Sequence, residues 1–196
     1  MIPILILAGG TSSRMRGGDK MLEDVGGVPL LRRQAQMALG TGHPVFVAVG
    51  PQMGQRRDAL KDMDVSMITV PEAAEGLSGT LRGAVAQLPQ CKAFMIMLGD
   101  LVALTTEDLQ SVLNARGTYP DHMIWRGATE DGKPGHPILI DQSLRSSFAS
   151  LQGDHGGESI LRPLRDKTQL VRLKEQHARF DLDTPEDWAA WRASFS

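Results

Sequence analysis

The chain has 196 residues, of which 41% are hydrophobic and 22% charged, and its formal net charge at pH 7 is −2. A chain of this length suits one domain, so we expect residues 1–196 to form a single domain whose core needs no disulfide or metal to fold. The near-neutral charge excludes a protein built around a nucleic-acid backbone, which would carry a basic stripe.

The expected compartment follows from the cysteine content and from the length of the apolar runs. The chain has one cysteine, Cys91, so it cannot form an internal disulfide. No apolar run approaches the ~18 residues of a membrane-spanning helix. The first run, Ile4–Leu7, lacks the basic flank and the small-residue cleavage pattern of a signal peptide. We therefore expect a cytoplasmic protein that has no membrane partner.

The first half of the chain alternates short apolar runs with helical patterns. Continuous apolar runs of strand length occupy Ile4–Leu7, Val45–Val49, Val65–Val70 and Phe94–Leu98. Helical patterns occupy Leu30–Leu39 and Ser78–Leu88, and a capping-box sequence begins another helix at Thr105. Continuous apolar runs are typical of strands that are buried on both faces in a parallel sheet. The alternation predicts an α/β fold with helices on both faces of the sheet and ligands at the carboxyl ends of its strands.

The second half of the chain is less regular. Two apolar segments, Met123–Trp125 and Pro137–Ile140, flank an Asp-Gly turn signal, which predicts an antiparallel pair added to the sheet. A late strand is expected at Leu170–Leu173. Pro185 followed by acidic residues predicts the start of a terminal helix.

A glycine-rich loop follows the first predicted strand, over Leu7–Lys20. Gly9 and Gly10 would let backbone N–H groups approach an anion, and Arg14 and Lys20 would add positive charge for phosphate oxygens. The loop lacks the Gly-Lys-Ser/Thr of a P-loop and the spacing of a G-x-G-x-x-G motif. A phosphate site and an ordinary surface loop with turn glycines therefore both fit the residues.

Three carboxylates are candidate metal ligands. Asp100 follows the most apolar predicted strand and would suit Mg²⁺, or it is a turn residue that caps the next segment. Asp181 and Asp183 lie in an extended segment, and we expect only one of them to face a given pocket. Asp183 is equally a natural N-cap for the terminal helix.

Small and polar residues mark three further candidate sites. Ser78 and Thr80 at a helix start could receive a base or a phosphate, although Ser78 also suits a simple cap. His136 precedes a predicted strand, and the loop 153–157, Gly-Asp-His-Gly-Gly, follows a helix. His136 and His155 form a metal pair or are unrelated surface residues.

The order of these motifs along the chain is more specific than any one of them. The series Leu-Ala-Gly-Gly-x-Ser-x-Arg-Met with a following Asp-Lys, then Gly-Leu-Ser-Gly-Thr-Leu-Arg, Gly-Asp, Gly-His-Pro, Gly-Asp-x-Gly and Asp-Leu-Asp-Thr-Pro-Glu-Asp resembles the MobA-like NTP transferase family. Within the family it most resembles the molybdenum cofactor cytidylyltransferases. The resemblance implies a three-layer α/β/α sandwich around a mostly parallel sheet with a Rossmann-like nucleotide-binding half, the nucleotide-diphospho-sugar transferase type.

The resemblance also implies a reaction. A Mg²⁺-dependent nucleotidyltransferase would move CMP from CTP to the phosphate of molybdopterin and release pyrophosphate. The alternatives are a guanylyltransferase that uses GTP on the same cofactor, a non-catalytic nucleotide- or cofactor-binding module for a molybdenum enzyme, and a nucleotidyltransferase for sugar or alcohol phosphates. A molybdenum enzyme is an expected partner, and nucleic acid is not.

Residue roles follow from the same resemblance. The nucleotide would be bound by Leu7, Ala8, Gly9, Gly10, Arg14, Lys20, Ser78 and Thr80. The catalytic residues would be Arg14, Lys20 and Asp100. Mg²⁺ would be held by Asp100 and Asp183, with Asp181 as the alternative second ligand. The acceptor would face His136, Gly153 and Asp154.

Three positions differ from the pattern typical of the family. Arg16 stands where glycine is usual, and Leu101 and Val102 stand where Gln-Pro is frequent. Gly157 and Glu158 replace an Ala-Arg pair, which puts an anion where a cation would face a polyanionic substrate. This last change concerns the acceptor more than the nucleotide.

Overall fold

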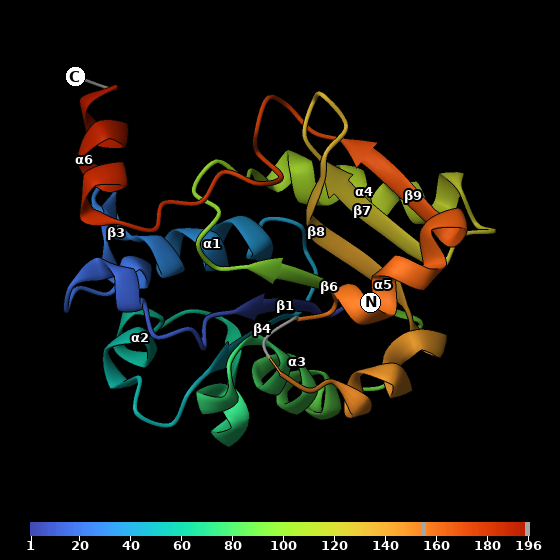
Figure 1. Cartoon of the computed structure of the whole chain (residues 1–196), viewed down its shortest axis with the longest axis horizontal. Coiled ribbons are helices and arrows are strands. Elements are labelled where there is room, and N and C mark those ends of the chain that lie inside the picture. The colour runs from blue at the N-terminus through green and yellow to red at the C-terminus, as the bar shows by residue number, and fades with distance from the viewer. Residues whose placement is uncertain (154–155, 195–196) are drawn as a thin grey trace.

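In the computed structural model, which describes residues 1–153 and 156–194, seven strands form one sheet in the order β5-β4-β1-β6-β8-β7-β9 (Figure 1). These strands are β1 (Ile4–Leu7), β4 (Val45–Val49), β5 (Val65–Thr69), β6 (Ala93–Leu98), β7 (Ile124–Ala128), β8 (Pro134–Asp141) and β9 (Thr168–Arg172). A separate hairpin consists of β2 (Asp24–Val25) and β3 (Val28–Pro29).

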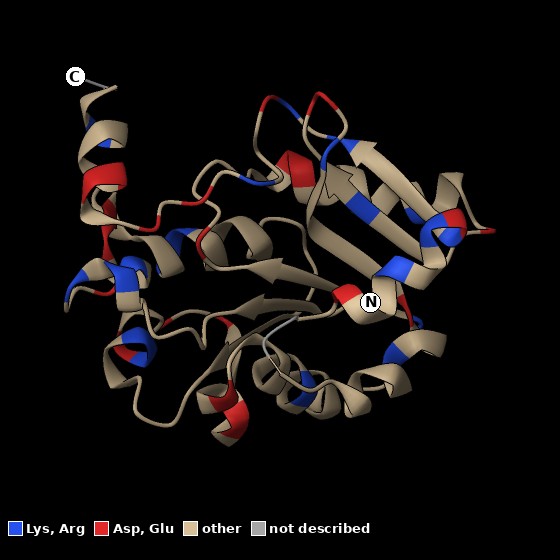
Figure 2. Ribbon diagram, in the orientation of Figure 1, with Lys and Arg blue, Asp and Glu red and all other residues tan. Residues whose placement is uncertain are grey.

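Helices connect most of the strands. The α-helices are α1 (Leu30–Leu39), α2 (Gly54–Ala59), α3 (Leu77–Gln87), α4 (Thr106–Thr118), α5 (Glu158–Leu161) and α6 (Pro185–Ala193). The 3₁₀ helices are η1 (Ser13–Met15), η2 (Lys20–Leu22), η3 (Pro71–Glu75), η4 (Gln142–Ser150) and η5 (Arg162–Lys167). Acidic and basic positions are mixed throughout these elements (Figure 2).

The sheet is mostly parallel, as the sequence predicted. Strand β1 pairs in parallel with β4 and β6, β4 with β5, and β7 with β9. Strand β8 is antiparallel to both of its neighbours, β6 and β7. The predicted antiparallel pair is therefore confirmed as β7 and β8, whose short connection can only reverse the chain direction.

Two hydrophobic cores cover the two faces of this sheet. Ile4 and Ile6 of β1 pack in a core with residues of α1 and α4, whereas Leu5 and Leu7 pack in a second core with residues of α3 and η4. Figure 1 shows α1 and α4 on the opposite side of the sheet from α3. Because alternate side chains of a strand point to opposite faces, both sets must be apolar, which explains the continuous apolar runs. The three-layer α/β/α sandwich is confirmed.

Three local features differ from the sequence-based expectation. Helix α2 was not predicted, because its six residues show no apolar period. His136 lies within β8, which begins at Pro134, and not in a loop before the strand. The terminal helix begins at Pro185 as expected, but its N-cap is Thr184, whose hydroxyl accepts a hydrogen bond from the backbone N–H of Asp187 in a capping box. The alternative that Asp183 caps this helix is therefore wrong.

Within residues 1–153 and 156–194, no helix combines the length and the apolar character needed to cross a membrane.

The fold brings three distant segments to one edge of the sheet. Strands β1 and β6 are parallel neighbours, so the loop after Leu7 and the loop after Leu98 leave the sheet side by side. An isolated antiparallel bridge between Leu101 and Asp181 then fixes the segment before α6 against the loop after β6. This edge is where the candidate ligands of the sequence meet.

Candidate functional site

A cavity of about 460 Å³ opens at this edge of the sheet. Its walls are the loop that follows β1, the start of α3 with the preceding η3, and the loop that follows β6. Of the residues predicted to bind the nucleotide, the ones that line it are Leu7, Gly9, Gly10, Arg14, Lys20 and Thr80. Asp100 and Asp183 line the same cavity. The structure therefore gathers most of the predicted site into one concave surface.

The loop after β1 lies close against α3. A side chain at Gly9 would place its Cβ 2.9 Å from Oγ1 of Thr80, so only glycine allows this approach without a shift. Further along the loop, Ser12 and Arg16 have φ values of 52° and 51°, in the left-handed region. Arg16 thus occupies a backbone conformation that glycine adopts more easily, at a position where the family usually has glycine.

Two of the predicted nucleotide-binding residues point elsewhere. The carbonyl oxygen of Ala8 accepts a hydrogen bond of 2.6 Å from Arg56. Ser78 is 1% exposed, and its hydroxyl accepts a hydrogen bond from the backbone N–H of Gly156 at 3.1 Å. Ser78 thus ties the start of α3 to the loop before α5.

Arg56, from α2, anchors the loop after β1 and was not found by sequence reasoning. Its side chain is 3% exposed and makes a two-point contact with Asp19, at 2.7 Å from Nε and 2.8 Å from Nη2. Nη2 also donates to the hydroxyl of Ser12 at 3.2 Å. Together with the bond to Ala8, these contacts fix both ends of the loop that ends at Lys20. A buried arginine on a short polar helix leaves no periodic signal in the sequence.

Lys20 lies between two carboxylates. Its Nζ is 2.5 Å from Oδ2 of Asp100 and 2.8 Å from Oδ1 of Asp183, and Arg14 contacts the other oxygen of Asp183 at 2.6 Å. Burial alone would lower the pKa of Lys20, but the charges and hydrogen bonds of Asp100 and Asp183 outweigh it and raise that pKa. Lys20 therefore stays positively charged at neutral pH.

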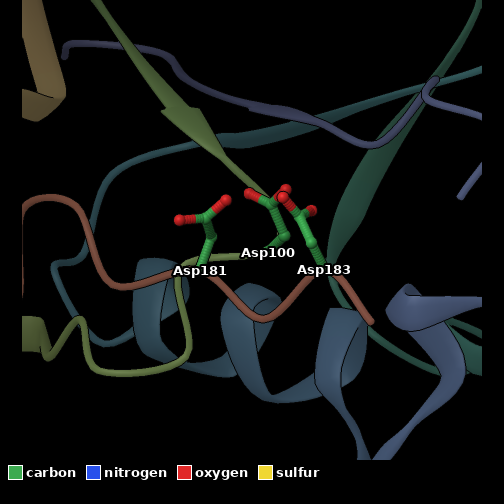
Figure 3. Close-up of side chains that lie close together, drawn as sticks. All are labelled: Asp100, Asp181 and Asp183. Atoms are coloured by element: carbon green, nitrogen blue, oxygen red, sulfur yellow. The ribbon is translucent and has the colours of Figure 1, made fainter. Parts of the chain in front are cut away.

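The two carboxylates that contact Lys20 lie close to a third, that of Asp181 (Figure 3). One oxygen each of Asp100, Asp181 and Asp183 lie within 4.8 Å of one another. The expectation that only one of Asp181 and Asp183 faces the site is wrong, because residues two apart in an extended segment point to the same side. Leu182 between them points the other way and packs beside Trp188.

The carboxylate cluster fits a hard divalent cation. Oδ1 of Asp100 is buried and has no hydrogen-bond partner among the described residues, so this carboxylate has an oxygen available as a ligand. The pKa of Asp181 is raised, chiefly by burial and then by the charges of Asp183 and Asp100. A cation bound between these groups would relieve that repulsion.

Of the predicted acceptor residues, only His136 shares a cavity with Asp181 in the described part of the chain. His136 lines a neighbouring cavity of about 430 Å³ that Asp181 also lines. Burial, followed by the charge of Arg126, lowers the pKa of His136 to about 4, so its ring is neutral at neutral pH. Gly153 is exposed in a turn, with φ 68°. Asp154 and His155, the other predicted acceptor and metal candidates, lie outside the described residues.

Comparisons with known proteins show the family of the chain. The family model of the MobA-like NTP transferase domain matches residues 4–172. A probable molybdenum cofactor guanylyltransferase of Trichormus variabilis is 31% identical over 195 residues, covering 97% of this chain and 90% of the relative. One of Synechococcus elongatus is 37% identical over 204 residues and covers 97% of each chain.

Solved structures support the fold. The crystal structure of Rv0371c from Mycobacterium tuberculosis superimposes with a TM-score of 0.83 at 23% sequence identity, covering 97% of this chain and 96% of that one. A synthetase structure complexed with CTP, that of CMP:2-keto-3-deoxy-manno-octonic acid synthetase, has a TM-score of 0.77 at 15% identity, covering 100% and 98% of the two chains. The described elements thus have the nucleotide-diphospho-sugar transferase fold.

We expect Arg56→Met to lower the free energy of unfolding by about 3 kcal/mol, because it leaves Asp19 and the Ala8 carbonyl without their buried partner. Urea unfolding followed by circular dichroism measures the change. The exposed Arg162 provides a matched control, Arg162→Met, which should stay near the wild-type value. A loss below about 1 kcal/mol for Arg56→Met, the range of exposed ion pairs, would show that Arg56 does not anchor the loop.

The lowered pKa of His136 predicts a specific titration. The folded pKa of about 4 lies below the ordinary 6.5, so the unfolded chain binds more protons between these values and stability falls as the pH drops through them. In a proton NMR titration, one histidine signal should have its midpoint near pH 4 and be absent from His136→Gln. That variant should also lose less stability in acid than the wild type. A midpoint above pH 6 for the His136 signal would contradict the burial of a neutral ring.

Proposed function

Because the chain belongs to the MobA-like NTP transferase family, we propose that it transfers a nucleoside monophosphate from an NTP to the phosphate of a molybdopterin-type acceptor. An oxygen of the acceptor phosphate attacks the α-phosphorus and forms the new P–O bond. The bond from the α-phosphorus to the oxygen that bridges to the β-phosphate breaks, and its electron pair leaves with pyrophosphate. Curated relatives are named probable molybdenum cofactor guanylyltransferases, and these names support both the reaction and the acceptor that we propose.

One observation carries the proposal: two cations and two of the three clustered carboxylates, Asp100 and Asp183, line the same cavity as the glycine-rich loop. Arg14 and Lys20 line this cavity and would neutralise the triphosphate and the charge that grows on the leaving pyrophosphate. The backbone of Gly9 and Gly10 would approach phosphate oxygens closely. Positioning and charge neutralisation account for most of the catalysis of phosphoryl-type transfers, so these groups match the chemistry that is required.

We propose that Mg²⁺ is held by Asp100 and Asp183, with Asp181 as a third ligand within reach. The ion would neutralise and orient phosphate oxygens when bound. Lys20 contacts both of these carboxylates. A triphosphate in the cavity would offer Lys20 a second set of anionic oxygens. Lys20 would then connect the proposed metal ligands to the bound nucleotide.

We propose GTP as the nucleotide. The Gly-His-Pro and Gly-Asp-x-Gly motifs favour a cytidylyltransferase, but the curated relatives of this chain are named guanylyltransferases and align over nearly its whole length. They support the guanylyl alternative better than the cytidylyl reading.

Pyrophosphate release tests the function and the nucleotide together. With molybdopterin and Mg²⁺ present, we expect release from GTP to exceed release from CTP by about tenfold or more, because one set of base contacts is left unpaired with the wrong nucleotide. A preference for CTP would restore the cytidylyl reading. Binding of GTP without any release would favour the non-catalytic module, and release only with sugar or alcohol phosphates would move the acceptor to that class.

Replacing the lysine tests its place in the mechanism. We expect Lys20→Ala to lower turnover by about 10²- to 10³-fold, the usual cost of one charge-stabilising donor, with the circular dichroism spectrum retained. The exposed Lys61 gives a matched control, Lys61→Ala, which should keep wild-type turnover. Near-normal activity of Lys20→Ala would remove this residue from the catalytic groups.

A further inference from the structure

Arg126 of β7 is a largely buried cation with a weakly held partner. Its side chain is 15% exposed, and its Nε donates a hydrogen bond of 3.0 Å to the carbonyl oxygen of Gly135, which fixes the plane of the guanidinium. Its contact with Glu158 is 3.4 Å long, and Glu158 is 54% exposed. Strong pairs of an arginine and a carboxylate are about 2.7–2.9 Å long, so this carboxylate is poorly engaged.

The position of Arg126 relates it to the carboxylate cluster. Arg126, Glu158 and His136 line the same cavity as Asp181, whose own carboxylate belongs to that cluster. The cavity is therefore next to the proposed metal site, on the side away from Arg14, which lines the nucleotide cavity. An acceptor phosphate must reach the α-phosphorus from such a neighbouring surface, since the triphosphate takes up the nucleotide cavity.

The positive charges in this second cavity come from arginine and not from histidine. His136, the residue that the motifs suggest for the acceptor, is neutral at neutral pH. Arg179 also lines the cavity, but it is exposed, and its Nη1 donates to the carbonyl oxygen of Pro134 at 3.2 Å. The buried, planar guanidinium of Arg126 is thus the best-placed group for an anion that must be held in one orientation.

The surroundings of Arg126 also indicate an organic anion. A third, smaller cavity of about 140 Å³ shares Arg126, His136 and Glu158 but is otherwise lined mostly by apolar side chains, among them Ile138 and Phe148. The guanidinium of Arg126 thus lies beside an apolar cavity wall. This combination suits a molecule that has an anionic group on a larger organic body. A phosphate monoester has this character.

We propose that Arg126 binds the phosphate monoester of the acceptor, and that this phosphate displaces Glu158 from the guanidinium. The inference rests on the proposed function and adds to it the residue that recognises the acceptor. Arg126 is then a specificity-determining residue, and Glu158 sets how easily the acceptor enters. A lysine in place of Arg126 would keep the charge but lose the planar, two-point contact.

Binding of molybdopterin by calorimetry, with and without GTP and Mg²⁺, tests this inference. Arg126→Gln should weaken molybdopterin binding by about 10- to 100-fold, the cost of a lost charged hydrogen bond, and Arg126→Lys should fall between that variant and the wild type. Glu158→Gln should bind molybdopterin about two- to fivefold more tightly, because a competing surface anion is gone. GTP affinity should stay unchanged in all three variants.

A matched control is Arg165→Gln, because Arg165 is exposed on η5 near Glu158 and should leave both affinities unchanged. Molybdopterin binding by Arg126→Gln within about twofold of the wild type would overturn the inference, and so would an equal loss of GTP binding, which indicates a structural role. Should Arg126→Gln fail to fold, unchanged binding by Glu158→Gln would overturn it. A wild-type protein that binds GTP but not molybdopterin would overturn the proposed function as well.

Discussion

The charge of Lys20 between Asp100 and Asp183 is the interaction on which the site depends. It joins the segment of the lysine to two others, which lie 80 and 163 residues further along the chain. Burial disfavours the charge on Lys20, but the charges and hydrogen bonds of Asp100 and Asp183 outweigh this effect and raise its pKa. Each of these charged groups needs the others to offset its charge, so the segments that carry Lys20, Asp100 and Asp183 must all be in place. The surrounding fold serves mainly to hold them there.

Two supports keep the segments in register. On one side, Arg56 holds Asp19, the residue directly before Lys20, and thereby fixes the backbone from which the lysine extends. On the other side, the bridge between Leu101 and Asp181 ties the segment before α6 to the loop that carries Asp100. Both supports are themselves buried or backbone contacts and do not depend on a ligand. The cavity is therefore formed in advance, and a nucleotide would enter it without having to order the loop.

Local patterns in the sequence predicted the main sheet well, because its strands appear as short apolar runs and most of its longer helices have an apolar period or a capping sequence. They also predicted that the glycine-rich loop and Asp100 share an edge, since parallel strands bring their carboxyl ends together. They could not find Arg56 or the pairing of Arg126 with Glu158, because such contacts join segments whose distance in sequence carries no pattern. The exclusion of either Asp181 or Asp183 failed for a simpler reason, as alternate residues of an extended segment share a face.

The two sides of the carboxylate cluster suggest how a chain with a net charge of −2 would bind the two anionic substrates proposed above. Attraction over long range would need an excess of positive charge, which this chain lacks. Positive groups are instead placed locally: Arg14 and Lys20 line the nucleotide cavity, and Arg126 lines the neighbouring one. Close contacts between a buried cation and a bound anion would be screened little by salt, whereas a diffuse surface charge would be screened strongly. Two anionic substrates would therefore be brought together at the point of reaction by the largely buried Lys20 and Arg126 and by the exposed Arg14.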